Sequence, residues 1–328
     1  MRLLFALLLS LPAAFAQANP ERLLQRPVEL DTGSGVLYGS LLLPQRDSPV
    51  PIALLIAGSG PTDRDGNNPM GRNDSLKRLA QALAKRGVAS LRYDKRGIAA
   101  SRAAGPDERE LSVERYVADA AAWGQKLKAD PRFGRLILIG HSEGALIASL
   151  AAEQAGADAL VSVAGSGRPI DQVLREQLQD KLPPPLLAQS AALIDALKAG
   201  HTRPEVPEEL LVLFRPSVQP YLISLFRQNP AAAFARLRLP ALIVQGSHDI
   251  QVGVPDAEAL KAVKPDAELV LIDGMNHVLR IVPAEAKQQL ASYNDPRLPL
   301  ARALPERIAR FIQRSARLAD SSRAPSGR

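Results

Sequence analysis

A short apolar run, residues 136–139, leads into a serine flanked by glycines, and a helix-forming segment follows at once. The turn reads Gly140-His-Ser-Glu-Gly144, with Ser142 at its centre. Glycines on both sides let the backbone bend sharply between a strand and a helix without clashes of Cβ atoms. Such a turn lifts a serine hydroxyl clear of a sheet, as a serine nucleophile requires. The alternative is a glycine-rich turn with an inert serine, and the flanking strand and helix argue against it.

Apolar runs alternate with helical patterns along most of the chain. The runs at 52–57, 136–139, 159–164 and 241–244 have the continuous apolar character of buried parallel strands. Segments with helical spacing of apolar residues separate these runs. This alternation predicts an α/β fold, in which helices flank both faces of a mostly parallel central sheet.

Two segments depart from the alternation. Residues 36–44 and the stretch around Val28 predict an antiparallel hairpin at the start of the sheet. Between residues 167 and 238 the helical pattern is broken by several prolines, which predicts a helical lid inserted over the edge of the sheet. The predicted organisation is a signal peptide at 1–16, an α/β core divided between 17–166 and 239–320, the lid at 167–238 and a disordered tail at 321–328.

The N-terminus predicts export. Residues 1–16 combine one basic residue, a short apolar stretch and the sequence Ala14-Phe-Ala16, which is typical of a secretory signal cleaved after Ala16. We therefore expect a secreted protein, periplasmic in a host with two membranes. No later segment is long and apolar enough to cross a membrane. The chain has no cysteine, so burial of the core, and not disulfides, must stabilise it.

The formal net charge is +7, and much of the excess lies in the arginine-rich C-terminal region. A solvated helix face explains this charge more simply than nucleic-acid binding does. Aromatic residues make up only 4% of the chain and leave few surfaces on which bases could stack. We therefore expect no nucleic-acid partner, and the oligomeric state does not follow from the sequence.

A serine hydroxyl becomes a nucleophile only when a base takes its proton and an acid fixes the tautomer of that base. Four histidines compete for the role of base. His141 adjoins the serine, where neighbouring side chains diverge, His201 lies in the proline-broken segment and His248 precedes an aspartate. His277 lies in a loop beyond the last apolar run and alone follows all the acids at the strand ends. We therefore predict His277 as the base.

Asp249 is the predicted acid. It ends the run at 242–248, which begins with apolar residues, so that its carboxylate would emerge at the carboxyl edge of the sheet. The chain order Ser142, Asp249, His277 is the one expected after a turn that carries a serine nucleophile. Asp273 is the rival, but it shares a short loop with the histidine. A cap of the next helix is the alternative role for Asp249.

Two backbone N–H groups are needed to stabilise a tetrahedral intermediate. Glu143, the residue after the nucleophile, would supply one oxyanion-hole donor, and Ser59, in the glycine-rich loop at 58–67, would supply the other. That loop also begins a dinucleotide-binding pattern, but Asp63 stands where the third glycine belongs, so we predict no cofactor. With no cysteine and only four histidines, we expect no metal site either.

Together these motifs resemble those of the α/β-hydrolases, and within them the bacterial esterase branch that is grouped with serine aminopeptidases. The matching segments occur in the expected order at 57–66, 92–97, 140–144, 246–249 and 276–277. The resemblance implies a catalytic triad of Ser142, Asp249 and His277, and esterase activity on short acyl esters. It also suggests an ion pair between Asp94 and Arg96 that supports the loop at the oxyanion site.

We therefore predict a serine hydrolase that cleaves short-chain carboxylic esters, with a small-molecule ester as substrate and an acyl-enzyme as intermediate. A serine peptidase or amidase is the first alternative, because the turn cannot separate ester from amide chemistry. In that case Glu205, Glu208 and Glu209 could recognise an amine, although an exposed acidic turn is the simpler interpretation. A non-catalytic exported binding protein on the same scaffold is the last alternative, and the complete set of catalytic residues argues against it.

Overall fold

The computed structural model describes residues 23–46, 49–179 and 181–323. The predicted signal peptide at 1–16 lies outside these ranges, as do residues 324–328 of the predicted tail. None of the helices in the described ranges is both long and apolar enough to pass through a lipid bilayer.

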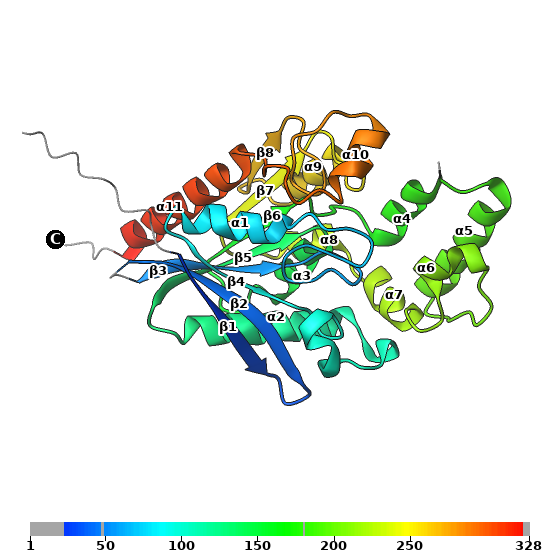
Figure 1. Ribbon diagram of the computed structural model, residues 1–328, viewed down its shortest axis with the longest axis horizontal. Coiled ribbons are helices and arrows are strands. Elements are labelled where there is room, and N and C mark those ends of the chain that lie inside the picture. The colour runs from blue at the N-terminus through cyan, green and yellow to red at the C-terminus, as the bar shows by residue number, and fades with distance from the viewer. Residues whose placement is uncertain (1–22, 47–48, 180, 324–328) are drawn as a thin grey trace, which may run out of the picture.

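A single eight-stranded sheet lies at the centre of the described molecule (Figure 1). The strands are β1 (Leu23–Asp31), β2 (Val36–Pro44), β3 (Val50–Ile56), β4 (Ala89–Tyr93), β5 (Phe133–His141), β6 (Ala159–Val163), β7 (Ala241–Gly246) and β8 (Glu268–Ile272). Their spatial order is β1-β2-β4-β3-β5-β6-β7-β8. β1 and β2 form the predicted antiparallel hairpin, β2 is also antiparallel to β4, and the remaining pairs are parallel. The predicted α/β architecture is confirmed.

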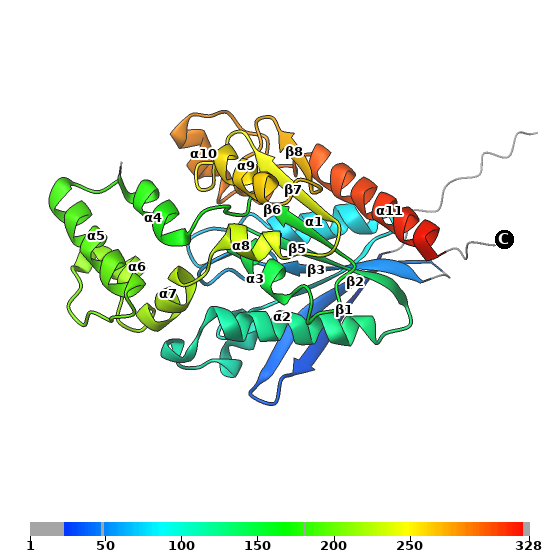
Figure 2. The ribbon, with the colours of Figure 1, turned by 180° about the vertical axis from the view of Figure 1, so that it is seen from behind.

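Helices cover both faces of the sheet. They are α1 (Ser75–Ala84), α2 (Val113–Lys128), α3 (Glu143–Ala151), α8 (Pro230–Ala235), α9 (Val254–Val263) and α11 (Ala303–Arg323). α1 and α11 pack on one face, and α2, α3, α8 and α9 pack on the other (Figure 1 and Figure 2). Successive side chains of a strand point to opposite faces of the sheet. Ala53 and Leu55 of β3 therefore pack on the face that α1 and α11 cover, and Leu54 and Ile56 pack on the other face.

The helical insertion, residues 167–238, lies between β6 and β7. Besides α8 it contains α4 (Ile170–Gln179), α5 (Pro184–Lys198), η3 (Glu208–Leu210), α6 (Leu211–Phe214) and α7 (Gln219–Phe226). In Figure 1, α5 and α6 lie beyond the end of the sheet, whereas α8 lies against it. Leu197, Leu210 and Phe214 are buried in an apolar cluster that the insertion forms largely from its own side chains.

Shorter helices occur in the connections: η1 (Ala99–Ala104) and η2 (Glu108–Glu110) follow β4, and α10 (Ala286–Ser292) follows β8. The closing helix α11 reaches Arg323, so residues 321–323 are helical and not part of a disordered tail as the sequence predicts. Pro305 lies in the first turn of the helix, where proline is tolerated, and the helix extends this far because neither glycine nor proline follows before Pro325.

Candidate active site

Ser142 lies at the sharp turn between β5 and α3. Its backbone angles, φ 56° and ψ −125°, are ones that non-glycine residues rarely adopt. The flanking glycines permit the turn, because a Cβ on Gly140 would lie 2.1 Å from the carbonyl oxygen of Gly144. A Cβ on Gly144 would lie 2.2 Å from the carbonyl oxygen of Ile56. The backbone strain at a serine in such a close-packed turn supports a functional role for this residue.

Asp249 and His277 are hydrogen-bonded to each other. His277 Nδ1 lies 2.8 Å from Asp249 Oδ2, and both side chains are buried. The other carboxylate oxygen, Oδ1, accepts hydrogen bonds from the backbone N–H groups of Gln251 (2.8 Å) and Val252 (3.0 Å). Burial raises the pKa of Asp249, but the charge and hydrogen bond of His277 and these two N–H groups outweigh it and lower the pKa overall. An ionised Asp249 holds the proton on His277 Nδ1 and leaves Nε2 free to act as a base.

The other predicted candidates for acid and base lie elsewhere. Asp273 is exposed, as is His201 in the helical insertion. His248 binds a backbone carbonyl oxygen through Nδ1 (2.6 Å). Of the acids and bases that the sequence offered, Asp249 and His277 are therefore the two that the structure brings together. Within the described ranges, no cluster of three or more histidine or acidic side chains is arranged to hold a metal ion.

His141 supports the site in a way that the sequence analysis missed. Its Nε2 lies 2.8 Å from the carbonyl oxygen of His277, so this nitrogen donates the hydrogen bond. The two imidazole rings also pack together, with their centroids 4.9 Å apart. Burial, followed by the nearby charge of His277, lowers the pKa of His141 to about 4. The side chain is therefore a neutral donor at ordinary pH, and it ties the loop of His277 to the residue before Ser142.

The loop after β3 passes directly beside Ser142. A Cβ on Gly58 would lie 3.1 Å from the Cβ of Ser142. Ser59 follows in this loop, and Glu143 begins α3, where backbone N–H groups have no partners within the helix. Both residues line one cavity together with Ser142. The structure thus brings both predicted oxyanion donors to the serine, whereas no hydrogen bond joins Ser142 to His277 within the described chain.

Lys95, which the sequence analysis did not single out, contacts both sides of this arrangement. Its side chain is buried, and its Nζ donates a hydrogen bond to the carbonyl oxygen of Gly58. The same Nζ lies 3.7 Å from Glu143 Oε1 and 5.1 Å from the centre of the Tyr116 ring. Burial lowers the pKa of Lys95, and Glu143 opposes this effect. The motif at 92–97 was the sequence signal, but it did not reveal the partners of the lysine.

The expected ion pair between Asp94 and Arg96 is wrong. Asp94 pairs with Arg64 (2.7 Å) and also accepts the backbone N–H of Arg64 (2.8 Å). Arg96 pairs with Asp119 of α2 (2.7 Å). β4 ends at Tyr93, so the chain turns at these residues and their side chains diverge. Asp94 still supports the loop beside Ser142, because Arg64 belongs to that loop.

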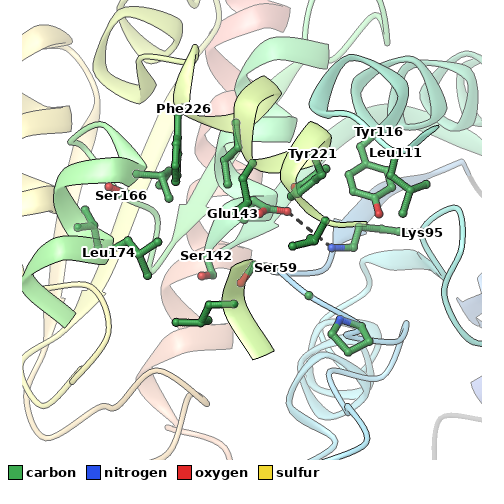
Figure 3. Close-up of a pocket in the computed structure, with 18 of the residues that line it drawn as sticks. Ser59, Lys95, Leu111, Tyr116, Ser142, Glu143, Ser166, Leu174, Tyr221 and Phe226 are labelled. Atoms are coloured by element: carbon green, nitrogen blue, oxygen red, sulfur yellow. Dashed lines mark ion pairs between the residues drawn. The ribbon is translucent and has the colours of Figure 1, made fainter. Parts of the chain in front are cut away.

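Ser142 opens into a cavity of about 430 Å³. Its walls come from the loop after β3, from α2 and from α4, α6 and α7 of the helical insertion. In Figure 3, Leu174 and Phe226 lie on one side of Ser142, and Lys95 and Tyr116 lie on the other. The cavity therefore offers an apolar wall and a hydrogen-bonding wall beside the same hydroxyl group.

Comparison with known proteins decides the family. The family described as serine aminopeptidase, S33, matches residues 72–281, which are more than half of the chain. The chain belongs to this family. The matched region contains Lys95, Ser142, Asp249 and His277, whereas Ser59 precedes it. Family membership bears out the resemblance that the sequence motifs indicate.

Among the relatives of this S33 family member is the esterase EstD of Thermotoga maritima, which is 30% identical over 269 residues. That match covers 81% of this chain but only 63% of the esterase, so the chain spans less than two thirds of its relative. Est1E of Butyrivibrio proteoclasticus, solved with ferulic acid, has a TM-score of 0.61 at 16% identity and covers 88% of this chain and 99% of its own. An esterase domain from Rhodothermus marinus has a TM-score of 0.56 at 19% identity, with coverage of 89% and 98%. These two structures show the shared α/β-hydrolase fold.

Proposed function

We propose that this chain is a serine esterase that cleaves short-chain carboxylic esters through an acyl-enzyme intermediate. The observations that carry the proposal are a strained Ser142 that opens to a cavity and a buried hydrogen bond between Asp249 and His277. His141, the residue before Ser142, holds the loop of His277 through its carbonyl oxygen (2.8 Å). The similarity to the esterase EstD supports ester hydrolysis as the reaction.

In the proposed reaction, His277 Nε2 takes the proton of Ser142 as the Oγ attacks the carbonyl carbon of the ester. Asp249 keeps the proton on Nδ1 and stabilises the imidazolium that forms. The tetrahedral intermediate then expels the alcohol, which receives the proton from His277, and the acyl group remains on Ser142. A water molecule, deprotonated by His277, releases the acid by the reverse sequence of steps. The Oγ of Ser142 and Nε2 of His277 would come within hydrogen-bonding distance when substrate binds, since catalytic hydrogen bonds are often long in the free enzyme.

The developing negative charge on the carbonyl oxygen requires donors that are already in place. We propose the backbone N–H groups of Ser59 and Glu143 for this role. Loss of one such donor typically costs about 2.7–4 kcal/mol of transition-state stabilisation. The N-terminus of α3 adds a favourable dipole at the same point.

Labelling with a fluorophosphonate tests the proposal, because the reagent modifies only an activated serine. We expect one adduct, located at Ser142 by peptide mass spectrometry, and hydrolysis of p-nitrophenyl acetate and butyrate. The Ser142→Ala variant should lose both labelling and hydrolysis while it keeps the far-UV circular dichroism of the wild type. Turnover by this variant close to that of the wild type would refute the mechanism.

A peptidase or amidase is the second candidate, and the description of the family favours it. An aminopeptidase must bind a free ammonium group, for which an unpaired carboxylate near the serine is needed. Glu205, Glu208 and Glu209 are exposed and do not line the cavity that contains Ser142. The two acids that do line it are each balanced by a base, Glu143 by Lys95 (3.7 Å) and Glu108 by Arg215. We therefore favour the esterase, and a comparison of p-nitrophenyl butyrate with amino-acid p-nitroanilides distinguishes the two.

We also propose that the protein is exported and begins at Gln17 after cleavage. The basic residue Arg2, the apolar stretch and the small residues before Gln17 support this proposal. Intact-mass measurement on protein from the periplasm or the medium tests it. Soluble cytosolic protein that retains residues 1–16 would contradict it.

A further inference from the structure

We propose that one wall of the cavity binds an uncharged hydroxyl group carried by the ester substrate. This wall, which we call the polar wall, consists of Lys95, Tyr116, Glu143 and Tyr221. The proposal rests on the proposed esterase function, since it assigns the chemistry of the ester that this site accepts. It goes beyond that function because it assigns a specificity role to the side chains of Glu143 and Tyr221, which take no part in bond cleavage.

The polar wall contains buried groups whose hydrogen-bonding capacity is unused. Both carboxylate oxygens of Glu143 and the hydroxyl of Tyr221 are buried and have no hydrogen-bond partner of acceptable geometry within the described chain. Glu143 is 6% exposed and Tyr221 is 8% exposed, yet both line the cavity. The Tyr221 hydroxyl faces the Glu143 carboxylate, since burial, followed by the charge of Glu143 and a side-chain contact with it, raises the pKa of Tyr221 well above its usual value.

Unpaired buried polar groups are costly, and most proteins avoid them unless a ligand or function requires them. Tyr116 shows the usual outcome on the same wall, because its hydroxyl lies 3.4 Å from the carbonyl oxygen of Arg96 and donates to it. Glu143 and Tyr221 differ in that their free atoms are next to the nucleophile. Figure 3 shows both side chains beside Ser142, on the side that faces Lys95 and away from Leu174.

The charges that line the cavity indicate that the bound group is neutral. The lining residues include two acids and two bases: Glu143 lies 3.7 Å from Lys95 Nζ, and Glu108 is bound by Arg215. Glu108 also accepts a hydrogen bond from Ser217 Oγ (2.6 Å). Because Lys95 and Glu143 balance each other, an ammonium or a carboxylate group would gain no net electrostatic attraction here and would still lose its hydration on burial.

A hydroxyl group satisfies both free partners at once. It can donate its proton to the Glu143 carboxylate and accept a hydrogen bond from the hydroxyl of Tyr221. Hydrogen bonds to an ionised acceptor are stronger than those between neutral groups. A substrate that lacks the hydroxyl would leave this hydrogen-bonding capacity unused in the complex, which is the condition under which enzymes discriminate strongly.

Two matched pairs of esters test this proposal on the wild-type protein. Methyl 6-hydroxyhexanoate against methyl heptanoate places the hydroxyl in the acyl part, and 2-hydroxyethyl butanoate against propyl butanoate places it in the alcohol part. In each pair a hydroxyl replaces a methyl group of similar size. We expect kcat/KM, measured by titration of the released acid, to be about tenfold or more higher for the hydroxylated ester in one of the pairs.

The Tyr221→Phe variant should lower this ratio of kcat/KM values by about tenfold, because only the free hydroxyl is removed. Tyr116→Phe is the matched control: it removes a tyrosine hydroxyl from the same wall that already has a partner, so the ratio should stay as in the wild type. A ratio near one in both pairs, or a high ratio that Tyr221→Phe leaves unchanged, would overturn the proposal.

A second measurement needs no variant. If the preference lies in the acyl part, 6-hydroxyhexanoate should inhibit the wild-type protein more strongly than heptanoate. If it lies in the alcohol part, ethylene glycol should inhibit more strongly than propanol. Equal inhibition in both comparisons would contradict the assignment. Failure of the esterase function itself would appear differently, as the absence of hydrolysis for all four esters and of labelling at Ser142.

Discussion

Lys95 donates a hydrogen bond from its buried Nζ to the carbonyl oxygen of Gly58. The peptide unit that carries this oxygen also carries the N–H of Ser59, one of the two proposed oxyanion donors. In a planar trans peptide unit the N–H points in the direction opposite to the C=O. A hydrogen bond that holds the carbonyl oxygen in place therefore also fixes the direction of the N–H. The same Nζ lies 3.7 Å from the carboxylate of Glu143, whose backbone N–H is the other proposed donor. Lys95 therefore connects the two halves of the proposed oxyanion hole and balances a negative charge beside it.

We expect Lys95→Met to lower kcat by about 10- to 100-fold with little change in KM, since it acts on a group used in the transition state. The affinity for a trifluoromethyl ketone, which forms a tetrahedral adduct, should fall in parallel with kcat. Lys264→Met is the matched control, because Lys264 is also buried and also donates to a backbone carbonyl, that of Leu237 (3.0 Å). Equal losses of kcat in both variants would mean that Lys95 only stabilises the fold.

Asp249→Asn should lower kcat by several orders of magnitude. The amide cannot stabilise the imidazolium of His277 and favours the wrong tautomer of the ring. Asp273→Asn should change kcat by less than about threefold, because Asp273 is exposed and its effect on His277 is screened by solvent. Steady-state kinetics with p-nitrophenyl butyrate measures both effects. If the Asp273 variant were the impaired one, the acid of the mechanism would have to be reassigned.

The elements of the fold were predictable because their signals are local. The apolar run before Gly140 identifies β5, and the glycines around Ser142 identify the turn. Partners that are distant in the sequence were not predictable in this way. Nothing near Lys95 indicates that Gly58 and Glu143 will contact it, and the sequence neighbours Asp94 and Arg96 diverge because a strand ends just before them.

His141 is a second residue whose distant partner the sequence does not reveal, and it lies at the site itself. Adjacent side chains usually point in different directions, so the sequence argues against a role for His141 beside Ser142. The strained backbone of Ser142 changes that geometry, and His141 reaches the carbonyl oxygen of His277 (2.8 Å). Only the tertiary arrangement of the two loops reveals this contact.

The buried His141 makes stability depend on pH. Its pKa falls from 6.5 to about 4 on folding, first because of burial and then because of the charge of His277. The unfolded chain takes up a proton below pH 6.5, whereas the folded chain does not do so until about pH 4. The stabilisation is therefore complete above pH 6.5 and is lost as the pH falls toward 4, with a maximum loss of about 3 kcal/mol from this group.

Urea denaturation at several pH values between 4.5 and 7.5 measures this dependence. We expect His141→Gln to reduce the loss of unfolding free energy between pH 7.5 and 4.5, because glutamine can donate to the same carbonyl but does not titrate. Asp249 will not obscure the comparison, since its lowered pKa places its own contribution below about pH 4. His201→Gln is the control, because His201 is exposed and its replacement should leave the pH dependence unchanged. Identical pH dependence in wild type and His141→Gln would contradict the prediction.

The helical insertion is attached to the core at the base of α4, which bears on the size of the acyl groups that the cavity accepts. Arg168 forms an ion pair with the fully buried Asp256 of α9 (2.8 Å). Gln177, near the end of α4, donates a hydrogen bond to the carbonyl oxygen of Gln251 (2.8 Å). A wall fixed at both ends of α4 favours a preformed cavity over a lid that opens at a lipid surface.

We therefore expect kcat/KM to be highest for acyl chains of about two to eight carbons, a range that suits a preformed cavity of this class. The rate should follow simple saturation as tributyrin passes its solubility limit, because no large movement of α4 is needed to admit substrate. A series of p-nitrophenyl esters from acetate to palmitate measures the first expectation, and titration of the acid released from tributyrin measures the second. Both expectations follow from the two contacts that hold α4, the Arg168–Asp256 ion pair and the hydrogen bond from Gln177 to Gln251. A maximum of kcat/KM at palmitate, or a sharp rise in rate above the solubility limit, would instead indicate a mobile insertion of the lipase type.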